Sequence, residues 1–210
     1  MSIISNLLNQ VINGLFGLVG DWGIAIILTT IVIRICLLPL SWKQKKSIKV
    51  QQELSKKIEE IKLNYANDKE KQEAEISKIS AESAKSMLGC IVTLIQIPIM
   101  YGLYNIFSQM PIDVGSVVVP WINNLKLPDA YHIIPFIAVI VQLLPSIIMT
   151  LRPIKDAKKG GLPLIQILLM GGLSMLFFIK APVTLGIYWV TSGLFSTLEQ
   201  IIYNKTLEKA

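Results

Sequence analysis

Apolar residues gather in long runs that are separated by shorter polar stretches. A helix rises about 1.5 Å per residue, so about 20 apolar residues cross the roughly 30 Å hydrocarbon core of a bilayer. Five runs have about this length, and the sequence therefore predicts an all-α membrane protein with five transmembrane helices. These predicted spans cover residues 22–40, 87–107, 133–151, 162–179 and 183–203.

Residues 1–20 follow a different pattern. Leu7, Val11, Leu15 and Leu18 recur at helical spacing, while Asn and Gln side chains occupy the other face. An uncharged helix with one apolar face is typical of a segment that lies along a membrane interface. We expect residues 1–20 to form an extracytoplasmic amphipathic helix. A sixth span is the alternative, and the polar face argues against it.

The stretch between the first two spans carries most of the charge. Eleven Lys and eight Asp or Glu fall between Lys43 and Lys85. Leu54, Ile58 and Ile61 form an apolar stripe at helical spacing, and the Asn- and Asp-containing stretch 64–68 favours a break. The pattern predicts a helical hairpin over residues 43–85, with a solvated charged linker as the alternative.

Composition limits the function classes. Apolar residues make up 52% of the 210 residues and charged residues only 16%, whereas soluble domains carry about 25% charged residues. This excludes a soluble enzyme, a disulfide scaffold and a disordered chain. The two Cys residues lack metal-ligand spacing, and neither a phosphate-binding loop nor a catalytic constellation lies in the spans. We expect no catalytic site, metal or cofactor.

Loop charges predict the orientation. The segment 43–85 and the loop 152–161 are rich in Lys and Arg, whereas the loop 108–132 has one Lys and two Asp. By the positive-inside rule the two basic loops and the tail 204–210 are cytoplasmic, and the N-terminus and the loop 108–132 are extracytoplasmic. The net charge of +6 is thus explained by topology, and we expect no nucleic-acid binding.

One cationic residue lies inside a predicted span. Arg34 precedes the end of the first span by about 9 Å of helix, and a guanidinium stays charged there. Placing it in a span costs roughly 2.5–3.5 kcal/mol. Its side chain either extends to the cytoplasmic headgroups or faces a hydrated cavity.

Polar side chains in the other spans favour the cavity. The candidate groove residues are Thr30 and Arg34 in the first span, Thr93 and Gln96 in the second, Gln142 in the third, and Tyr188, Trp189 and Ser192 in the fifth. A single polar residue in a span usually joins two helices, but several polar faces around one cation indicate a shared hydrophilic groove. Because no acidic residue lies mid-span, the charge of Arg34 is available to a visiting anion.

Four segments occur in order that resemble one known family. They are IVIRICLLPLSWKQKKS in the first span, LIQIPIMYGLYNIF in the second, VPWINNLKLPDAYHIIP in the extracytoplasmic loop and GIYWVTSGLFSTLEQ in the fifth span. Together they resemble the YidC family of membrane protein insertases, with its mitochondrial oxidase-assembly and thylakoid Albino relatives. The chain is similar to the five-span core of Gram-positive members.

The resemblance implies an insertase and chaperone of single-span and polytopic membrane proteins, located in the bacterial cytoplasmic membrane and independent of nucleotide hydrolysis. Arg34 would be the arginine of the groove, with Gln96 and Trp189 as further groove residues. Newly made membrane proteins and lipid are the implied partners, with the ribosome and the Sec translocon as further candidates. A small anion channel or transporter that uses the same cavity is the alternative function, and a purely structural assembly factor is a third.

Overall fold

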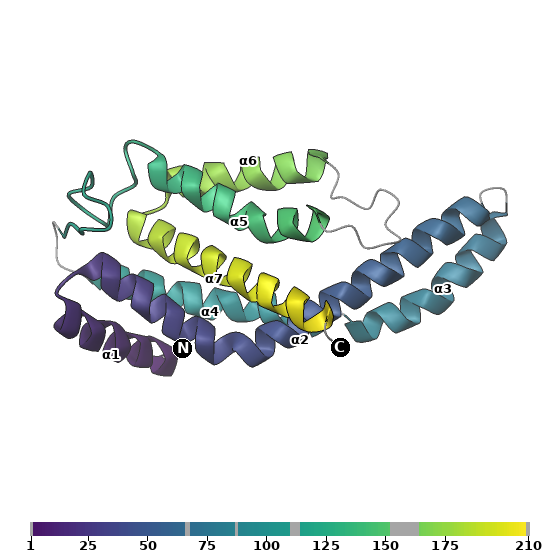
Figure 1. Ribbon diagram of the computed structural model, residues 1–210, viewed down its shortest axis with the longest axis horizontal. Helices are drawn as coiled ribbons and strands as arrows, with labels where there is room; N and C mark the ends of the chain where they lie inside the picture. The colour runs from purple at the N-terminus through teal and green to yellow at the C-terminus, as the bar shows by residue number, and fades with distance from the viewer. Residues whose placement is uncertain (1, 66–67, 87, 110–113, 152–163, 209–210) are drawn as a thin grey trace. The chain divides into compact units, whose positions relative to one another are not determined.

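The computed structural model describes residues 2–65, 68–86, 88–109, 114–151 and 164–208 (Figure 1). Its helices are α1 Ser2–Val19, α2 Trp22–Asn64, α3 Lys69–Ser86, α4 Leu88–Gln109, α5 Ile133–Leu151, α6 Leu164–Lys180 and α7 Val183–Glu208. These ranges contain no strand, which confirms the predicted all-α fold. The predicted loop 152–161 lies outside the described residues.

The chain divides into two compact units. One comprises Met1–Ile35 together with Tyr101–Ala210, and the other comprises Cys36–Met100. We call them the helix-core unit and the hairpin unit. All side chains of the candidate site discussed below, apart from those of α4, belong to the helix-core unit.

Helix length supports one of the five predicted spans directly. Within the described ranges, Trp22–Ile48 is the stretch that is both long and apolar enough to cross a membrane. Ile97–Phe107, Ile133–Pro145 and Gly171–Lys180 are apolar but shorter. The remaining four spans therefore stay predictions.

Helix α2 is longer than the span predicted within it. It passes through Pro39 without a break and ends only at Asn64. The residues after Pro39 are rich in Lys, Gln and Glu, which favour helix and do not terminate it. A single helix therefore contains both the predicted first span and the first arm of the predicted hairpin.

The hairpin unit pairs the second half of α2 with α3 (Figure 1). Leu54 is buried in this unit, and the Gln72 side-chain amide donates to the Lys62 carbonyl across the two helices at 3.3 Å. Asp68 precedes α3 and accepts from the Lys71 backbone N–H at 3.2 Å. The hydrogen bond from the Lys71 side chain lowers the pKa of Asp68 below its ordinary 3.8. Helix α2 ends at Asn64 and Asp68 precedes α3, as expected of residues that cap helices and favour turns.

In the helix-core unit, α5 packs against both α6 and α7. Glycines bring α7 close to α5, since a Cβ added at Gly186 would overlap Ile134 Cγ2 and one added at Gly193 would lie 2.7 Å from Val141 Cγ1. Small residues at a helix interface allow backbones to approach closely, which raises the dispersion energy of the contact. Helices α5 and α7 therefore form a tight apolar pair.

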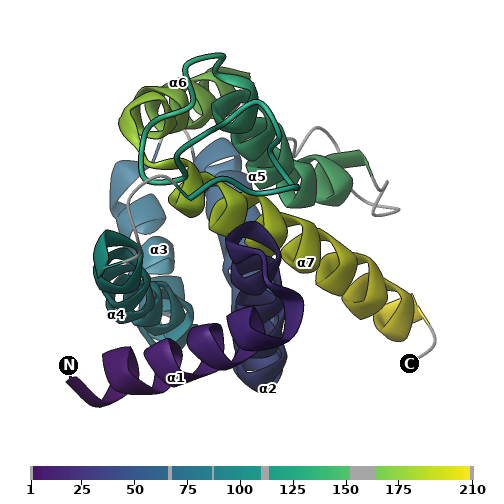
Figure 2. The same ribbon diagram turned by 90° about the vertical axis from the view of Figure 1, so that its left-hand side faces the viewer.

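The first helix runs across the start of α2 (Figure 2). The ring of Phe16 stacks on Trp22 with a centroid distance of 4.1 Å. Gly20 ends α1 with a φ of +68°, which a residue without Cβ adopts easily. Ile12 is buried, whereas Leu18 is 83% exposed. One part of the apolar face thus packs on protein while another remains open, and the interfacial placement of α1 stays a prediction.

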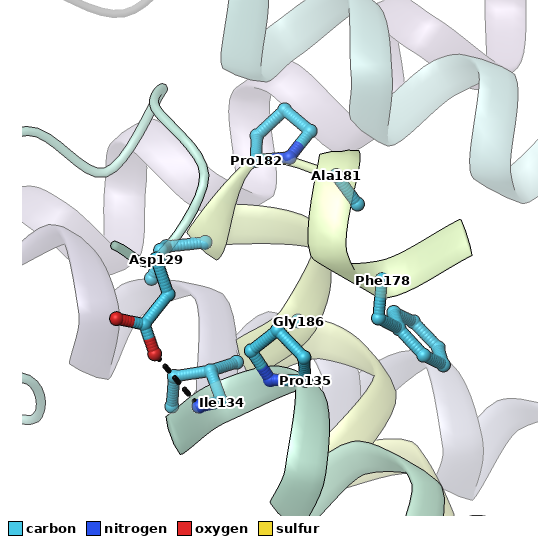
Figure 3. Close-up of a pocket in the computed structure, with 8 residues that line it drawn as sticks. Asp129, Ile134, Pro135, Phe178, Ala181, Pro182 and Gly186 are labelled. Atoms are coloured by element: carbon cyan, nitrogen blue, oxygen red, sulfur yellow. Dashed lines mark hydrogen bonds between the residues drawn. The ribbon is translucent and has the colours of Figure 1, made fainter. Parts of the chain in front are cut away.

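The loop 114–132 joins the beginnings of α5 and α7. Asp129 Oδ2 accepts from the Ile134 backbone N–H at 2.8 Å (Figure 3). The backbone N–H groups of Val183 and Thr184 donate to loop carbonyls, each at 3.0 Å. The first N–H groups of a helix lack partners within the helix, and here the loop carbonyls accept their hydrogen bonds. The pocket drawn in Figure 3, which includes Asp129, Phe178 and Gly186, leaves no room for a water molecule.

Candidate functional site

The guanidinium of Arg34 joins α2 to α7. Its Nε donates to Ser192 Oγ at 2.7 Å, and its Nη2 donates to the same oxygen. Ser192 is 3% exposed, whereas Arg34 is half-buried. The two residues are 158 positions apart in sequence, so the contact depends on the folded helix-core unit.

The orientation of the Ser192 hydroxyl differs from that of nearby hydroxyls. In helices, Ser and Thr side chains often donate to the carbonyl four residues earlier. Thr30 donates in this way at 2.7 Å and Thr191 at 2.8 Å. Ser192 instead accepts from the guanidinium of Arg34. Thr30 is buried, so it contributes packing beside Arg34 while its hydroxyl bonds to its own helix.

The two predicted aromatic groove residues lie in different surroundings. Tyr188 precedes Ser192 by one turn and is buried on the same face of α7. The ring of Trp189 packs against α6, with centroid distances of 5.3 Å to Phe178 and 6.2 Å to Phe177. Tyr188 therefore shares a face of α7 with Ser192, and its ring also contacts Trp189 at a centroid distance of 6.1 Å. Trp189 belongs to an aromatic cluster between α6 and α7.

The other predicted groove residues are not brought to Arg34 by any described contact. The amide of Gln142 donates to Ser174 Oγ at 3.0 Å, which joins α5 to α6. A hydrogen bond of this kind stabilises the packing of two helices. Ser174, the partner of Gln142, was not among the predicted residues. Thr93 and Gln96 lie on α4, and their side chains fall outside the described residues.

An apolar groove runs between α2 and α7. Its volume is about 350 Å³. The walls include Ile27 and Ile31 of α2, and Ile187, Thr191, Leu194 and Leu198 of α7. Leu194 and Leu198 are 47% and 60% exposed, so the groove is open along its side. Thr191 precedes Ser192 directly, and Ile31 precedes Arg34 by one turn. The polar contact and the apolar groove are therefore neighbours on the same two helices.

A second polar contact fixes the other end of this part of α2. Asp21 caps the helix by accepting from the Ile24 N–H at 2.9 Å. The same carboxylate accepts from the Ser116 hydroxyl at 2.7 Å and from the Val117 N–H at 2.9 Å. Partial burial acts to raise the pKa of Asp21, but hydrogen bonds from Ile24, Ser116 and Val117 outweigh it and lower the pKa below 3.8.

The cap on α2 was predictable only in part from the sequence. An Asp before an apolar helix is a common N-cap, so the sequence alone could indicate that Asp21 caps the helix. Its partners in the loop are 95 and 96 residues away, and no local pattern indicates them. Helix α2 is thus held through Asp21 at its start and through Arg34 about 20 Å further along the helix axis.

The arrangement is suited to binding an anion. A guanidinium presents N–H donors in a planar fork that matches a carboxylate, and Arg34 gives its described hydrogen bonds to a neutral hydroxyl. In the part of the chain that the structure describes, no three His, Cys, Asp or Glu side chains gather as a metal site would require.

Comparison with known proteins identifies the family. A sequence model described as "60Kd inner membrane protein" matches residues 14–210. A protein of Fusobacterium nucleatum named membrane protein insertase YidC is 32% identical over 210 residues, which cover 98% of either chain. The chain belongs to the YidC family. This confirms the family predicted from the four motifs.

Other YidC relatives differ in length. A YidC insertase of Wolinella succinogenes is 31% identical over 198 residues, which cover 92% of this chain and 35% of that protein. A YidC insertase of Caldanaerobacter subterraneus is 29% identical, and the match covers 98% of that protein. The chain thus spans about a third of some YidC relatives and almost all of others. A crystal structure of an active YidC insertase with its first transmembrane domain resolved matches 94% of this chain and 45% of its own, with a TM-score of 0.67 and 25% identity.

Proposed function

We propose that this YidC-family chain inserts membrane proteins into the bilayer and assists their folding there, without nucleotide hydrolysis. The observation that carries the proposal is the contact between Arg34 and Ser192. Arg34 lies in Trp22–Ile48, the described stretch that is long and apolar enough to cross a membrane, and its partner is neutral, so the guanidinium can attract an anionic part of a client. The family names of the relatives support the same activity.

The proposal includes an arrangement in the membrane. Five helices surround a hydrophilic groove that opens toward the cytoplasm, in the bacterial cytoplasmic membrane. The N-terminus and the loop 108–132 are extracytoplasmic, and the hairpin 43–85 and the C-terminus are cytoplasmic. The charge distribution of the loops supports this orientation.

Insertion begins with a client that carries a short acidic tail. The tail enters the groove, where Arg34 holds it transiently, and the apolar segment of the client then moves into lipid. Each buried CH₂ contributes about 0.8 kcal/mol, so an apolar helix drives the step without nucleotide. Moving a negative charge outward gains about 2.3 kcal/mol per 100 mV of membrane potential.

The candidate residues have different proposed roles in binding the client. Arg34 binds the client's carboxylate, with Thr30, Tyr188 and Ser192 forming its surroundings. Thr93, Gln96, Gln142 and Trp189 are proposed to contact other parts of the client in the groove. Lipid receives the released segment, and the ribosome and the Sec translocon are proposed to deliver clients to the cytoplasmic hairpin.

Insertion by purified protein in liposomes tests the proposal. The clients are one single-span protein with Asp residues in its tail and the same protein with Asn in their place. Wild-type chain should insert both. Arg34→Ala should reduce insertion of the acidic client about tenfold, whereas Arg34→Lys should largely preserve it because the charge remains.

Two controls separate the proposal from its alternatives. Equal insertion of the acidic client by all three versions would refute the charge role of Arg34. Anion flux in liposomes without client, lost in Arg34→Ala, would instead identify a channel or transporter. Insertion without such flux supports the insertase.

A further inference from the structure

The contact between Arg34 and Ser192 blocks the site that a client carboxylate would use. Both described hydrogen bonds of the guanidinium, from Nε and from Nη2, end on one hydroxyl oxygen. These two nitrogens form one edge of the planar fork that holds a carboxylate. A carboxylate that binds through this edge must displace Ser192.

We propose that Ser192 is the resting partner of Arg34 and that it competes with the carboxylate of an acidic client for the guanidinium. This inference rests on the proposed function. Ser192 is a positioning residue, because it holds the guanidinium against α7 until a stronger acceptor arrives. A charged acceptor forms a stronger hydrogen bond than a neutral one, so the carboxylate of an acidic client displaces Ser192, whereas a neutral client leaves the contact between Arg34 and Ser192 in place.

The surroundings explain why Arg34 moves and Ser192 stays. Ser192 is buried on α7, and the adjacent Gly193 packs closely against Val141 of α5. Arg34 is half-buried on α2, and its long side chain reaches across to the serine. Exchange of partners therefore requires only a movement of the guanidinium.

The apolar groove next to this contact binds the client residues that follow the carboxylate. Thr191 and Ile31 line the apolar groove between α2 and α7, directly beside Ser192 and Arg34 in the chain. A carboxylate bound at Arg34 places the following residues of the client at the mouth of this groove. Because Arg34 and the apolar groove are adjacent, the site favours a client in which an acidic residue lies next to an apolar segment.

Both described hydrogen bonds of the guanidinium end on a neutral hydroxyl. Two described ion pairs, Lys71 with Asp68 and Lys78 with Glu75, are exposed and belong to the hairpin unit. The competition is therefore between Ser192 and the client. Losing one hydrogen bond to a charged group changes an equilibrium by roughly ten- to 150-fold.

The test compares Ser192→Ala with the control variant Thr197→Val, on the same helix, in the liposome assay with acidic and neutral clients. Ser192→Ala should lower the half-saturating concentration of the acidic client by roughly ten- to 150-fold and leave that of the neutral client unchanged. Thr197→Val should change neither, because Thr197 donates to the Gly193 carbonyl of its own helix and is not among the residues that line the groove. Ser192→Asp places a permanent carboxylate beside Arg34, and it should reduce acidic-client insertion to the level of Arg34→Ala.

The outcomes separate this inference from the proposed function. If Arg34→Ala impairs the acidic client but Ser192→Ala leaves the ratio between clients unchanged, the role of Ser192 is refuted and the proposed function stands. Equal loss for both clients in Ser192→Ala would show a merely structural serine and also overturn the inference. If Arg34→Ala has no effect on either client, the proposed function itself fails.

Discussion

Helix α7 has two interfaces of opposite character. Against α5 it packs through Gly186 and Gly193, where no space remains for a Cβ. Against α2 it leaves an apolar groove of about 350 Å³ and makes a polar contact between Arg34 and Ser192. The same helix is thus fixed on one side and loosely joined on the other.

The difference indicates how one fold can be both stable and able to open. Close apolar packing loses many dispersion contacts at once when it separates. A hydrogen bond between side chains can be exchanged for another of similar strength, since the net contribution of one such bond is about 1 kcal/mol. We therefore expect substitutions at the α5–α7 interface to affect stability and those at the α2–α7 interface to affect client handling.

The largest effect is expected at the close contact of α5 and α7. Gly193→Leu forces a side chain against Val141 and should lower the free energy of unfolding by about 3 kcal/mol. Thermal unfolding of the detergent-solubilised protein measures this loss. The matched control is Gly172→Leu on α6, because a Cβ there meets nothing within 4 Å. Equal losses in the two variants would contradict the comparison.

A smaller effect is expected at the start of α2. Asp21→Ala removes the N-cap and the acceptor for Ser116 and Val117, and it should cost about 1 kcal/mol. Asp21→Asn keeps a capping oxygen and should lose less. A loss in Asp21→Asn as large as in Asp21→Ala would show that the charge, and not the cap, holds the helix.

The lowered pKa of Asp21 gives this contact a pH dependence. A carboxyl whose pKa is lower in the folded state stabilises the fold above its unfolded value of 3.8, and this contribution is lost as the pH falls through the folded pKa. The stability difference between wild type and Asp21→Asn should therefore be constant near neutral pH and shrink below about pH 3.8. Unfolding measured over that range checks the sign, and a difference that grows on acidification would refute it.

The smallest effect is expected between α5 and α6. Gln142→Leu removes a hydrogen bond to Ser174 and should cost about 0.6 kcal/mol. Insertion of acidic and neutral clients should fall slightly and equally, because Gln142 has no described contact with Arg34. A change in the ratio between the two clients would place Gln142 in carboxylate recognition.

Local patterns predicted the helices well. The apolar run 133–151 coincides with α5, and Pro182 directly precedes the first residue of α7, as expected of a residue that favours helix starts. The end of α2 was less predictable, because the predicted first span ended at residue 40, directly after Pro39, whereas the helix continues to Asn64. A proline within a long helix bends it without stopping it when good helix formers follow.

The contacts of the site were harder to predict. The charge of Arg34 and its need for a polar surrounding followed from the cost of burying a guanidinium. Its choice of Ser192 did not follow, since Ser192 and Thr191 look alike in sequence and differ only in the direction that each faces on α7. The loop contacts of Asp21 and Asp129 depend on residues brought together by folding, which a local pattern does not reveal.

Arg34 is proposed to lie in a hydrated space beside the apolar part of α2, and labelling by a water-soluble reagent tests this placement. In a chain with Cys36 and Cys90 replaced by Ser, single cysteines are placed at Arg34 and, as the control, at Ile31 in the apolar groove. A membrane-impermeant maleimide is then added from the cytoplasmic side of sealed vesicles. Position 34 should react readily and position 31 slowly. Equal inertness of both positions would contradict it.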